Sequence, residues 1–262
     1  MKPILKWAGG KRWLVPYLST IWNMYRLYNK EPRLVEPFCG SLAVSLGLNP
    51  QRALLNDINS CLINFYKHVQ NGLIVEITME NDEKLYYQHR NRLNELIKED
   101  NLSKEAAEIF YYLNRTCFNG LCRFNQKGEF NVPFGRYKKI NYIRDFTNYK
   151  EVFRDWEFTN LDFEEVKIEP DDFIYADPPY DVEFTQYSKE DFTWTDQERL
   201  VEWLKDHEGP VIISNQATSR IIELYKDYGY KIKFLTAPRR ISIDGNRTPA
   251  REVLAIRNLE EV

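Results

Sequence analysis

The stretch RLVEPFCGSLAVSLGLNPQRALLND, residues 33–57, decides the fold. Its first six residues predict a buried strand, and the small residues behind them predict a tight turn into a helix. Residues 52–57 predict a second short strand that ends in an acid. Two strands joined through a helix at this spacing indicate a βαβ unit, the building block of parallel sheets.

The alternation of strands and helices resumes in the second half of the chain. Apolar runs predict strands, and apolar residues at spacings of three and four predict helices. The expected strands are 173–177, 210–215, 230–236 and 252–257, and the expected helices are 196–207 and 219–229. Repeated alternation of this kind is typical of a doubly wound, mostly parallel, Rossmann-like α/β sheet.

A long helical segment interrupts this pattern. Residues 59–114 carry apolar residues at helical spacing, whereas residues 115–137 mix Asn-Gly, Lys-Gly and proline with aromatic residues and arginines. The second part therefore predicts a β-hairpin with loops. We expect a sheet domain built from residues 1–58 and 145–262, and a helical insertion, residues 59–144, that carries the hairpin.

The composition limits the class of protein. The chain has 262 residues, of which 43% are hydrophobic, enough for a substantial core. No apolar run approaches the roughly 20 residues that span a bilayer, and no signal peptide is evident, so we expect a cytoplasmic protein. The four cysteines form no CxxC pair and the three histidines are scattered, which argues against a metal site and a disulfide framework.

The net charge of −3 conceals strong local charges. Residues 1–33 hold seven bases and one acid, and residues 112–154 hold nine bases and three acids, a net charge of +6 in each segment. Residues 156–198 hold fourteen acids and two bases, a net charge of −12. Such runs are often only solvated faces, but local fields govern the binding of nucleic acid more than the total charge does.

The segment FIYADPPY, residues 173–180, places an acid, two prolines and an aromatic ring where a strand leaves the sheet. An exocyclic amino group on a nucleobase is a poor nucleophile because its lone pair is delocalised into the ring. Asp177 and the Pro178 carbonyl can accept hydrogen bonds from its two N–H groups and make the lone pair available, and Pro178 and Pro179 stiffen the backbone. Tyr180 offers a stacking face worth about 1–3 kcal/mol, and a sulfonium methyl donor would complete the reaction. The plainer alternative is a Pro-Pro turn with Asp177 as a cap.

Glu36 and Asp57 also stand at the ends of predicted strands. An acid about 20 residues after the first turn, as Asp57 is, suits hydrogen bonds to ribose hydroxyls, although a helix N-cap is an equal alternative. The first turn contains one glycine, Gly40, and no GxGxxG pattern. A nucleoside without phosphates therefore fits better than a dinucleotide.

Seven segments follow the order found in one family of enzymes. They are KWAGGK (6–11), LVEPFCGS (34–41), LLNDIN (54–59), YLNRTCFNGLCRFNQKGEFNVPFGRY (112–137), YADPPY (175–180), ISN (213–215) and RRISIDGNRT (239–248). The chain thereby resembles Dam-type DNA adenine-N6 methyltransferases, in the motif order of the alpha class of amino methyltransferases. The resemblance implies a methyltransferase sheet and S-adenosylmethionine as the cofactor.

The resemblance also implies the site residues. The cofactor-binding set is Trp7, Lys11, Phe38, Gly40, Asp57 and Asp177, and the catalytic set is Asp177, Pro178, Pro179 and Tyr180. Ser41 and Leu42 replace the glycine-rich continuation common in the family, a departure near the methionine end of the cofactor.

A third set of residues is expected on DNA. Lys6, Phe118, Asn119, Leu121, Arg123 and Pro133 are implied to read or part the bases, and Arg115, Lys138 and Lys139 to contact phosphates. Arg123 can donate two hydrogen bonds to a guanine. Phe118, where the family often has tyrosine, and Leu121 are expected wedges for a flipped base, the alternative being simple loop packing. Residues 239–248 are expected to grip the DNA backbone.

We therefore expect an orphan or restriction-associated enzyme that methylates adenine in double-stranded DNA at a GATC-like site. It would act on the nucleoid of a bacterium, encoded there or by a phage, as a monomer or a weak dimer on DNA. Two alternatives stay open. Relatives that methylate RNA or a protein glutamine generally carry Asn at the position of Asp177, and a silent DNA-binding regulator would be expected to lose that acid or Tyr180.

Overall fold

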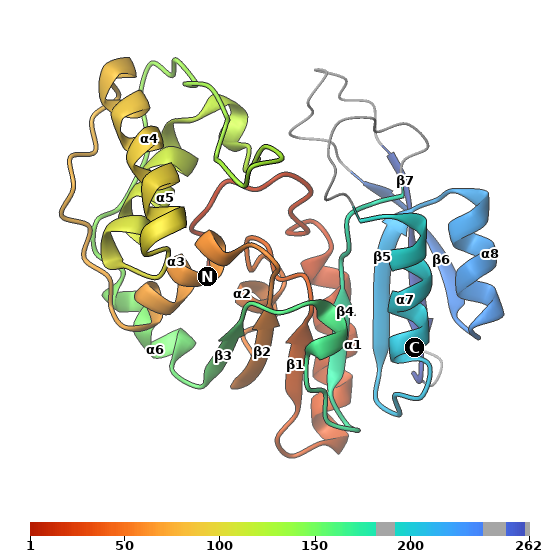
Figure 1. The fold of residues 1–262 in the computed structure, drawn as a ribbon. Coiled ribbons are helices and arrows are strands. Elements are labelled where there is room, and N and C mark those ends of the chain that lie inside the picture. Colours follow the sequence, from red (N-terminus) through yellow and green to blue (C-terminus); the bar gives the residue numbers. More distant parts are fainter. Residues whose placement is uncertain (182–191, 238–249, 260–262) are drawn as a thin grey trace.

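A seven-stranded sheet forms the centre of the computed structural model, which describes residues 1–181, 192–237 and 250–259 (Figure 1). The strands are β1 (Arg33–Glu36), β2 (Arg52–Asn56), β3 (Trp156–Thr159), β4 (Phe173–Ala176), β5 (Val211–Gln216), β6 (Lys231–Ala237) and β7 (Ala250–Arg257). Their order across the sheet is β3-β2-β1-β4-β5-β7-β6. Strands β1 to β5 run parallel, and β7 is antiparallel to both of its neighbours. The expected mostly parallel sheet is confirmed.

Helices cover both faces of this sheet. The described helices are α1 (Val15–Tyr28), α2 (Ser45–Leu48), α3 (Ser60–Gln70), α4 (Glu83–Glu99), α5 (Lys104–Thr116), α6 (Thr147–Phe153), α7 (Trp194–Leu204) and α8 (Ser219–Asp227), with short 3-10 turns η1 (Phe118–Gly120) and η2 (Phe163–Glu165). Helices α4 and α5 belong to the insertion, where α4 packs on α5 and α5 on α3. In β1, Leu34 joins the hydrophobic cluster that contains α1 and α3, whereas Val35 joins the cluster that contains α7 and α8. Successive strand residues thus face opposite helical layers, as a doubly wound fold requires.

Four elements differ from the sequence-based expectation. Helices α1 and α6 and strand β3 are not indicated by the patterns considered. The helix expected after the first strand is only the single turn α2. It ends early because Asn49 adopts a left-handed conformation and Pro50 follows it.

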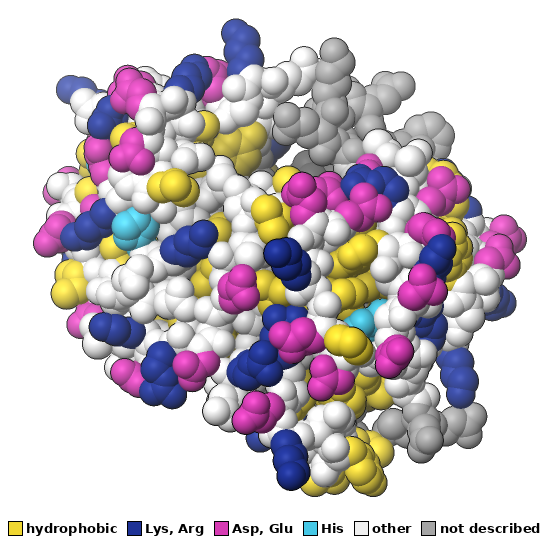
Figure 2. Space-filling view, turned by 60° about the horizontal axis from the view of Figure 1, so that its bottom comes forward, with side chains coloured by type: hydrophobic (Ala, Val, Ile, Leu, Met, Phe, Trp, Pro, Cys, Tyr) yellow, Lys and Arg dark blue, Asp and Glu magenta, His cyan; other side chains and the backbone are white. Residues whose placement is uncertain are grey.

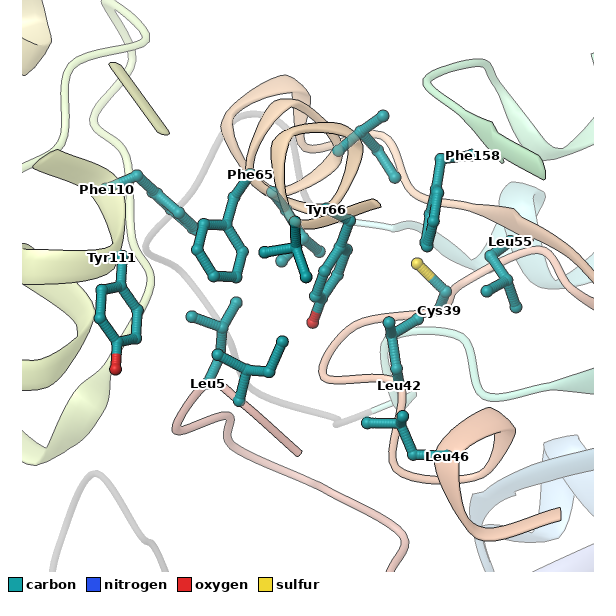
Figure 3. Close-up of a cluster of buried hydrophobic side chains, with 14 of the residues drawn as sticks. Leu5, Cys39, Leu42, Leu46, Leu55, Phe65, Tyr66, Phe110, Tyr111 and Phe158 are labelled. Carbon is teal, nitrogen blue, oxygen red and sulfur yellow. The ribbon is translucent and has the colours of Figure 1, made fainter. Parts of the chain in front are cut away.

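The helical insertion shares its core with the sheet. Figure 3 shows side chains from the sheet and from α3 and α5 in one cluster, in which Tyr66 stacks on Phe158 at 5.6 Å and Phe65 stacks on Tyr111 at 5.5 Å between ring centroids. Residues 71–82 interrupt the helices, contrary to the continuous helical segment expected. The proposed division of the chain at residues 59 and 144 stays a prediction.

The segment 115–137 folds back on itself without forming regular strands. Its antiparallel pairing consists of isolated bridges, among them Phe124 with Phe130. Asn94 of α4 donates to the carbonyl of Phe130 at 3.2 Å and accepts from its N–H at 2.8 Å. A side-chain amide therefore satisfies the backbone where a hairpin would use a neighbouring strand.

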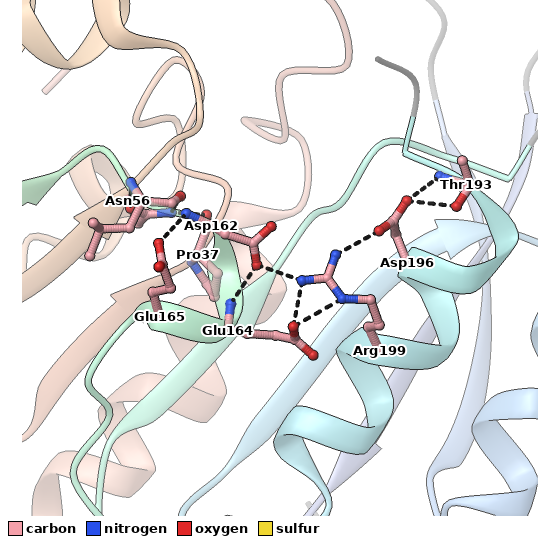
Figure 4. Close-up of polar contacts among 9 residues, drawn as sticks. Pro37, Asn56, Asp162, Glu164, Glu165, Thr193, Asp196 and Arg199 are labelled. Carbon is pink, nitrogen blue, oxygen red and sulfur yellow. Dashed lines mark hydrogen bonds and ion pairs between the residues drawn. The ribbon is translucent and has the colours of Figure 1, made fainter. Parts of the chain in front are cut away.

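Part of the acidic segment is neutralised within the fold. Arg199 on α7 pairs with Asp162 at 2.8 Å, with Asp196 at 2.7 Å and with Glu164 (Figure 4). On the face seen in Figure 2, acidic and basic side chains are interspersed. Within the described ranges, no helix has the length and apolar character needed to cross a membrane.

Candidate active site

The carboxyl ends of the central strands meet at a topological switch point. Strand β1 pairs with β2 on one side and with β4 on the other, although β4 follows much later in the chain. Open α/β sheets bind ligands at such a point, outside the carboxyl ends of the strands. Glu36, Asp57 and Asp177 end or follow β1, β2 and β4, so all three acids lie at this edge.

The carboxylate of Asp177 is held from two sides. Its Oδ2 accepts from Lys11 Nζ at 2.8 Å, and its Oδ1 accepts from the Ser214 hydroxyl at 2.7 Å. Lys11 is buried and also donates to the carbonyl of Gly9 at 2.9 Å. These partners are side chains, not the backbone N–H groups that a cap would bind. Because each carboxylate oxygen has two lone pairs, Asp177 can still accept a hydrogen bond from a ligand.

Tyr180 is anchored through its hydroxyl. The group donates to Glu252 Oε2 at 2.7 Å, and Glu252, on β7, is buried. Lys11 Nζ lies 4.7 Å from the centroid of the Tyr180 ring, within cation–π range. Burial raises the pKa of Tyr180 well above its usual value, and the charges of Asp177 and Glu252 raise it further. Tyr180 therefore presents a neutral aromatic ring held in a fixed position.

The two prolines between these residues have different surroundings. Pro178 is buried and Pro179 is exposed. The carbonyl of Pro179 accepts a hydrogen bond from Gln197 Nε2 on α7 at 2.9 Å. The loop after β4 is thus fastened to the helical layer as well as to the sheet.

Asp57 closes the turn that follows β1. Its Oδ2 accepts from the N–H of Gly40 at 3.0 Å, and its Oδ1 accepts from the N–H of Asn59 at 3.0 Å. The N-cap of α3 is Asn59, whose side chain accepts from the N–H of Leu62. The alternative in which Asp57 caps this helix is therefore wrong. Burial raises the pKa of Asp57, and its two backbone hydrogen bonds oppose that shift.

Gly40 brings the same turn into contact with Trp7. Its φ of 44° is a conformation that glycine adopts without strain. A Cβ at this position would lie 2.8 Å from Trp7 Nε1. The carbonyl of Gly40 accepts from the Tyr66 hydroxyl at 2.8 Å. Two residues of the expected cofactor site, Trp7 and Gly40, are thus packed together, and no larger residue fits in place of the glycine.

Glu36 serves the fold instead of facing a ligand. It is 3% exposed, and its Oε1 accepts from the N–H of Ser45 at 2.8 Å and from the Ser45 hydroxyl. Burial raises the pKa of Glu36 to about 8, against the opposing effect of the hydrogen bonds from Ser45. The acid at the end of β1 therefore stabilises the start of α2.

An aromatic wall lies beside the end of β1. The ring centroid of Phe38 is 5.5 Å from that of Phe163 and 5.5 Å from that of Phe192. Phe38 belongs to the expected cofactor site, but the other two rings come from segments with no recognised motif. Such flat surfaces suit stacking of a heteroaromatic base.

Residues 6–11 connect the acidic edge to the segment 115–137. The backbone N–H and carbonyl of Lys6 bond to the side chain of Asn114 at 2.9 and 2.8 Å. Lys6 Nζ donates to the carbonyl of Arg115 at 3.2 Å and lies 3.9 Å from the Tyr137 ring centroid. Burial lowers the pKa of Lys6, and the charge of Arg115 lowers it further. A Cβ at Gly120 would collide with Lys6, so the loop and the lysine meet closely.

The expected base-reading residues share one loop. Phe118 is 44% exposed, and its N–H donates to the Pro133 carbonyl at 2.8 Å. Asn119 has a φ of 53° and is exposed, whereas Leu121 is packed in part against the core. The exposure of Phe118 is compatible with a wedge, and the packing of Leu121 agrees in part with the plainer alternative.

Arg123 and the expected phosphate-binding residues differ in the hydrogen bonds that they already make within the protein. Arg123 Nε donates to Asn131 Oδ1 at 2.8 Å, which leaves other guanidinium donors for a ligand. Arg115 donates to the backbone carbonyl of Asn141 at 2.6 Å, so it also stabilises the fold. Lys138 and Lys139 are exposed.

Two other expectations concern a loop and metal ions. The arginine-bearing residues 239–248 lie outside the described residues. Across the described ranges, no group of three or more His, Cys, Asp and Glu side chains is arranged to hold a metal ion.

Comparisons with known proteins place the chain in a family. A family model described as D12 class N6 adenine-specific DNA methyltransferase matches residues 7–240. The chain is 38% identical to the DNA N-6-adenine-methyltransferase of Escherichia phage P1 over 97% of its own length, but it spans only 35% of that relative. It is 34% identical to the Retron Ec67 DNA adenine methylase of Escherichia coli, covering 98% of this chain and 91% of that protein. It is 35% identical to the DNA adenine methylase of Escherichia coli strain K12, with coverages of 97% and 95%.

Proposed function

Because the chain belongs to the D12 class N6 adenine-specific DNA methyltransferases, we propose that it methylates the N6 amino group of an adenine flipped out of duplex DNA at a GATC-like site. The observation that carries this proposal is the loop after β4. There a carboxylate, a proline carbonyl and an anchored aromatic ring stand at the switch point of the sheet. These are the groups that a neutral exocyclic amine needs in order to become a nucleophile.

S-adenosylmethionine is the methyl donor of this family. The site fits its adenosine part in three respects: the acid Asp57 beside the turn, the aromatic wall that begins at Phe38, and the close contact of Gly40 with Trp7. We assign these four residues to its binding, with Lys11 and Asp177 toward its methionine part. When bound, the donor supplies an electrophilic methyl carbon on a sulfonium.

The chain's own groups prepare the amine. Asp177 and the carbonyl of Pro178 would each accept a hydrogen bond from one N–H of the N6 amino group, which favours a pyramidal nitrogen with an available lone pair. Lys11 and Ser214 fix the carboxylate while leaving it acceptor capacity. Tyr180 would stack on the flipped base, and the bond from its hydroxyl to Glu252 holds the outer end of the side chain in place.

The segment 115–137 would read the DNA, within a recognition domain of residues 59–144. Arg123 would donate bidentately to one guanine and Lys6 would contact the outer guanine, with Asn119 and Pro133 beside them. Lys6 already contacts this loop, which supports its assignment to the same surface. Arg115, Lys138 and Lys139 are assigned to phosphates.

Flipping a base out of the duplex costs a few kcal/mol because the base loses its pairing and stacking. Apolar side chains that take its place in the stack offset part of this cost. Phe118 is assigned this role because it is partly exposed on the same loop as Arg123. Leu121 would assist it from a more buried position.

The decisive experiment measures transfer of a tritiated methyl group from labelled S-adenosylmethionine. The acceptors are a duplex with one GATC site, the same duplex with GTTC in its place, a single-stranded RNA of the same sequence, and a protein with a glutamine substrate motif. Label confined to the GATC duplex is the expected result.

Each other outcome removes a part of the proposal. Equal label in both duplexes would refute the GATC specificity. Label in RNA or protein alone would show that the substrate is RNA or protein and not DNA. Binding of the duplex without any transfer would favour a silent DNA-binding protein.

A further inference from the structure

Pro178 and Pro179, in the loop after β4, have no N–H group with which to hold the direction of the backbone. Proline has no N–H, and its ring fixes φ while leaving ψ free. Only φ and ψ of Pro179 lie between the carbonyl of Pro178 and that of Pro179. Because the ring sets φ, ψ of Pro179 is the one free torsion between the two carbonyls. A group that holds the Pro179 carbonyl therefore limits the directions that the Pro178 carbonyl can take.

Gln197 is the group that holds it. Its Nε2 donates to the Pro179 carbonyl at 2.9 Å, and the side chain is 1% exposed, so water does not compete for this bond. Its Oε1 accepts from Asn215 Nδ2 at 3.0 Å. The second bond decides which end of the Gln197 amide faces the proline, because only the NH2 end can donate.

Asn215 extends this support to the far side of the loop. It is completely buried on β5, and its Oδ1 accepts from the N–H of Asp181 at 3.2 Å. Its Nδ2 also donates to the hydroxyl of Tyr225 at 3.0 Å. The carboxylate of Asp181 pairs with Arg220. The loop is thus fastened at Pro179 and at Asp181 by buried amides that lie behind it.

We propose that Gln197 is a positioning residue for methyl transfer, which acts through the Pro179 carbonyl to aim the Pro178 carbonyl at the amino group of the target adenine. The inference rests on the proposed function and adds a residue that touches neither the base nor the methyl donor. Loss of this bond should slow the chemical step, because a misplacement of about 1 Å can reduce a rate by about 100-fold. Binding of the donor and flipping of the base depend on other residues and should persist.

The test uses two variants of the full chain. Gln197→Met keeps the length of the side chain and removes both hydrogen bonds. Gln197→Glu keeps an acceptor for Asn215 but, as a carboxylate, cannot donate to Pro179. At a pH high enough to ionise the introduced carboxyl, the single-turnover rate of methyl transfer should fall by about 10- to 100-fold in both variants, with dissociation constants for donor and DNA within about twofold of wild type. A 2-aminopurine at the target position should show the same rise in fluorescence on binding as with wild type.

A change of pH separates positioning from general damage. A protonated carboxyl can donate a hydrogen bond, so Gln197→Glu should regain rate relative to wild type as the pH falls, whereas Gln197→Met should not. The matched control is Glu198→Gln, the reverse exchange at the next, exposed position of α7, which should transfer methyl at the wild-type rate.

Two results would overturn the role of Gln197. One is a wild-type transfer rate in both variants. The other is a slower rate accompanied by an equal loss of donor affinity, DNA affinity or melting temperature, which would make Gln197 a purely structural residue. Failure of the wild-type chain to methylate DNA is a separate outcome, because it refutes the proposed function whatever the variants do.

Discussion

Lys11 and Asp177, 166 positions apart in the chain, form an ion pair with Nζ 2.8 Å from Oδ2. The lysine side chain is 4% exposed and the aspartate side chain 21% exposed. The short segment from Lys6 to Lys11 therefore contacts the loop assigned to DNA at one end and the catalytic loop at the other. A shift of this segment on DNA binding would therefore move Lys11 relative to the carboxylate of Asp177.

Replacing Lys11 by methionine should destabilise the protein. Hydrogen bonds to charged groups contribute about 1.5–3 kcal/mol, and Asp177 would lose one of its two described partners. Urea unfolding should show a free energy of unfolding lower by this amount, whereas Lys30→Met, at an exposed position, should change little. In the double variant with Asp177→Asn the losses should be less than additive, and strict additivity would show that the pair is not coupled.

Replacing Asp177 by alanine should abolish methyl transfer and leave duplex binding nearly intact. The carboxylate is proposed to accept a hydrogen bond from the amine in the transition state, whereas DNA affinity is proposed to depend on the segment 115–137. Tritium transfer and fluorescence anisotropy measure the two properties separately. Activity within a few fold of wild type would contradict the acceptor role.

Replacing Glu36 by glutamine should flatten the pH dependence of stability. Burial raises the pKa of Glu36 to about 8 from its ordinary value of 4.5, so between these pH values the folded state binds a proton that the unfolded state releases. This stabilisation is complete below the lower value and is lost as the pH rises toward the upper one. A glutamine side chain cannot titrate, so the urea midpoint of Glu36→Gln should fall less than that of wild type between about pH 5 and about pH 8. Parallel curves would show that Glu36 is ionised in the fold.

Arg123→Ala and Lys139→Ala should weaken DNA binding in different ways. Loss of a bidentate arginine costs about 1–3 kcal/mol at one guanine and relaxes discrimination there. Loss of a phosphate contact weakens all sequences alike and lowers the slope of log affinity against log salt by about 1. Titrations of GATC and single-substituted duplexes at several salt concentrations measure both effects. Equal weakening of all duplexes by Arg123→Ala would assign that residue to phosphates.

The sequence predicts the sheet well because its central strands carry strong local signals. The strands at 33–36 and 173–176 are almost entirely buried and lead into recognisable turns. Strand β3 escapes notice because WEFT, residues 156–159, exposes Glu157 and leads into no recognised motif. The predicted β-hairpin is only partly present: residues 115–137 fold back on themselves through isolated bridges without regular strands, and the side chain of Asn94, from α4, replaces part of the strand pairing.

The motif after β4 can be recognised in the sequence, but the residues that support this loop cannot. Ser214, Gln197 and Glu252 bond to the loop from 37, 18 and 72 positions away along the chain. Such contacts depend on the order of strands in the sheet, which no local pattern encodes. Ser214 lies in a motif that the resemblance includes, whereas Gln197 and Glu252 look like ordinary polar residues of a helix and a strand.

Strand β7 lies between β5 and β6 although the ribosome makes it after both. A nascent chain that has reached residue 237 holds every residue of the catalytic loop, but β6 still lacks β7, its partner in the described sheet, and Tyr180 lacks Glu252. Because a domain generally folds as a unit during synthesis, the stacking ring would be locked only at a late step of translation. A ribosome stalled before this strand would therefore carry the full sequence of the motif after β4, but Tyr180 would not yet have its hydrogen-bond partner.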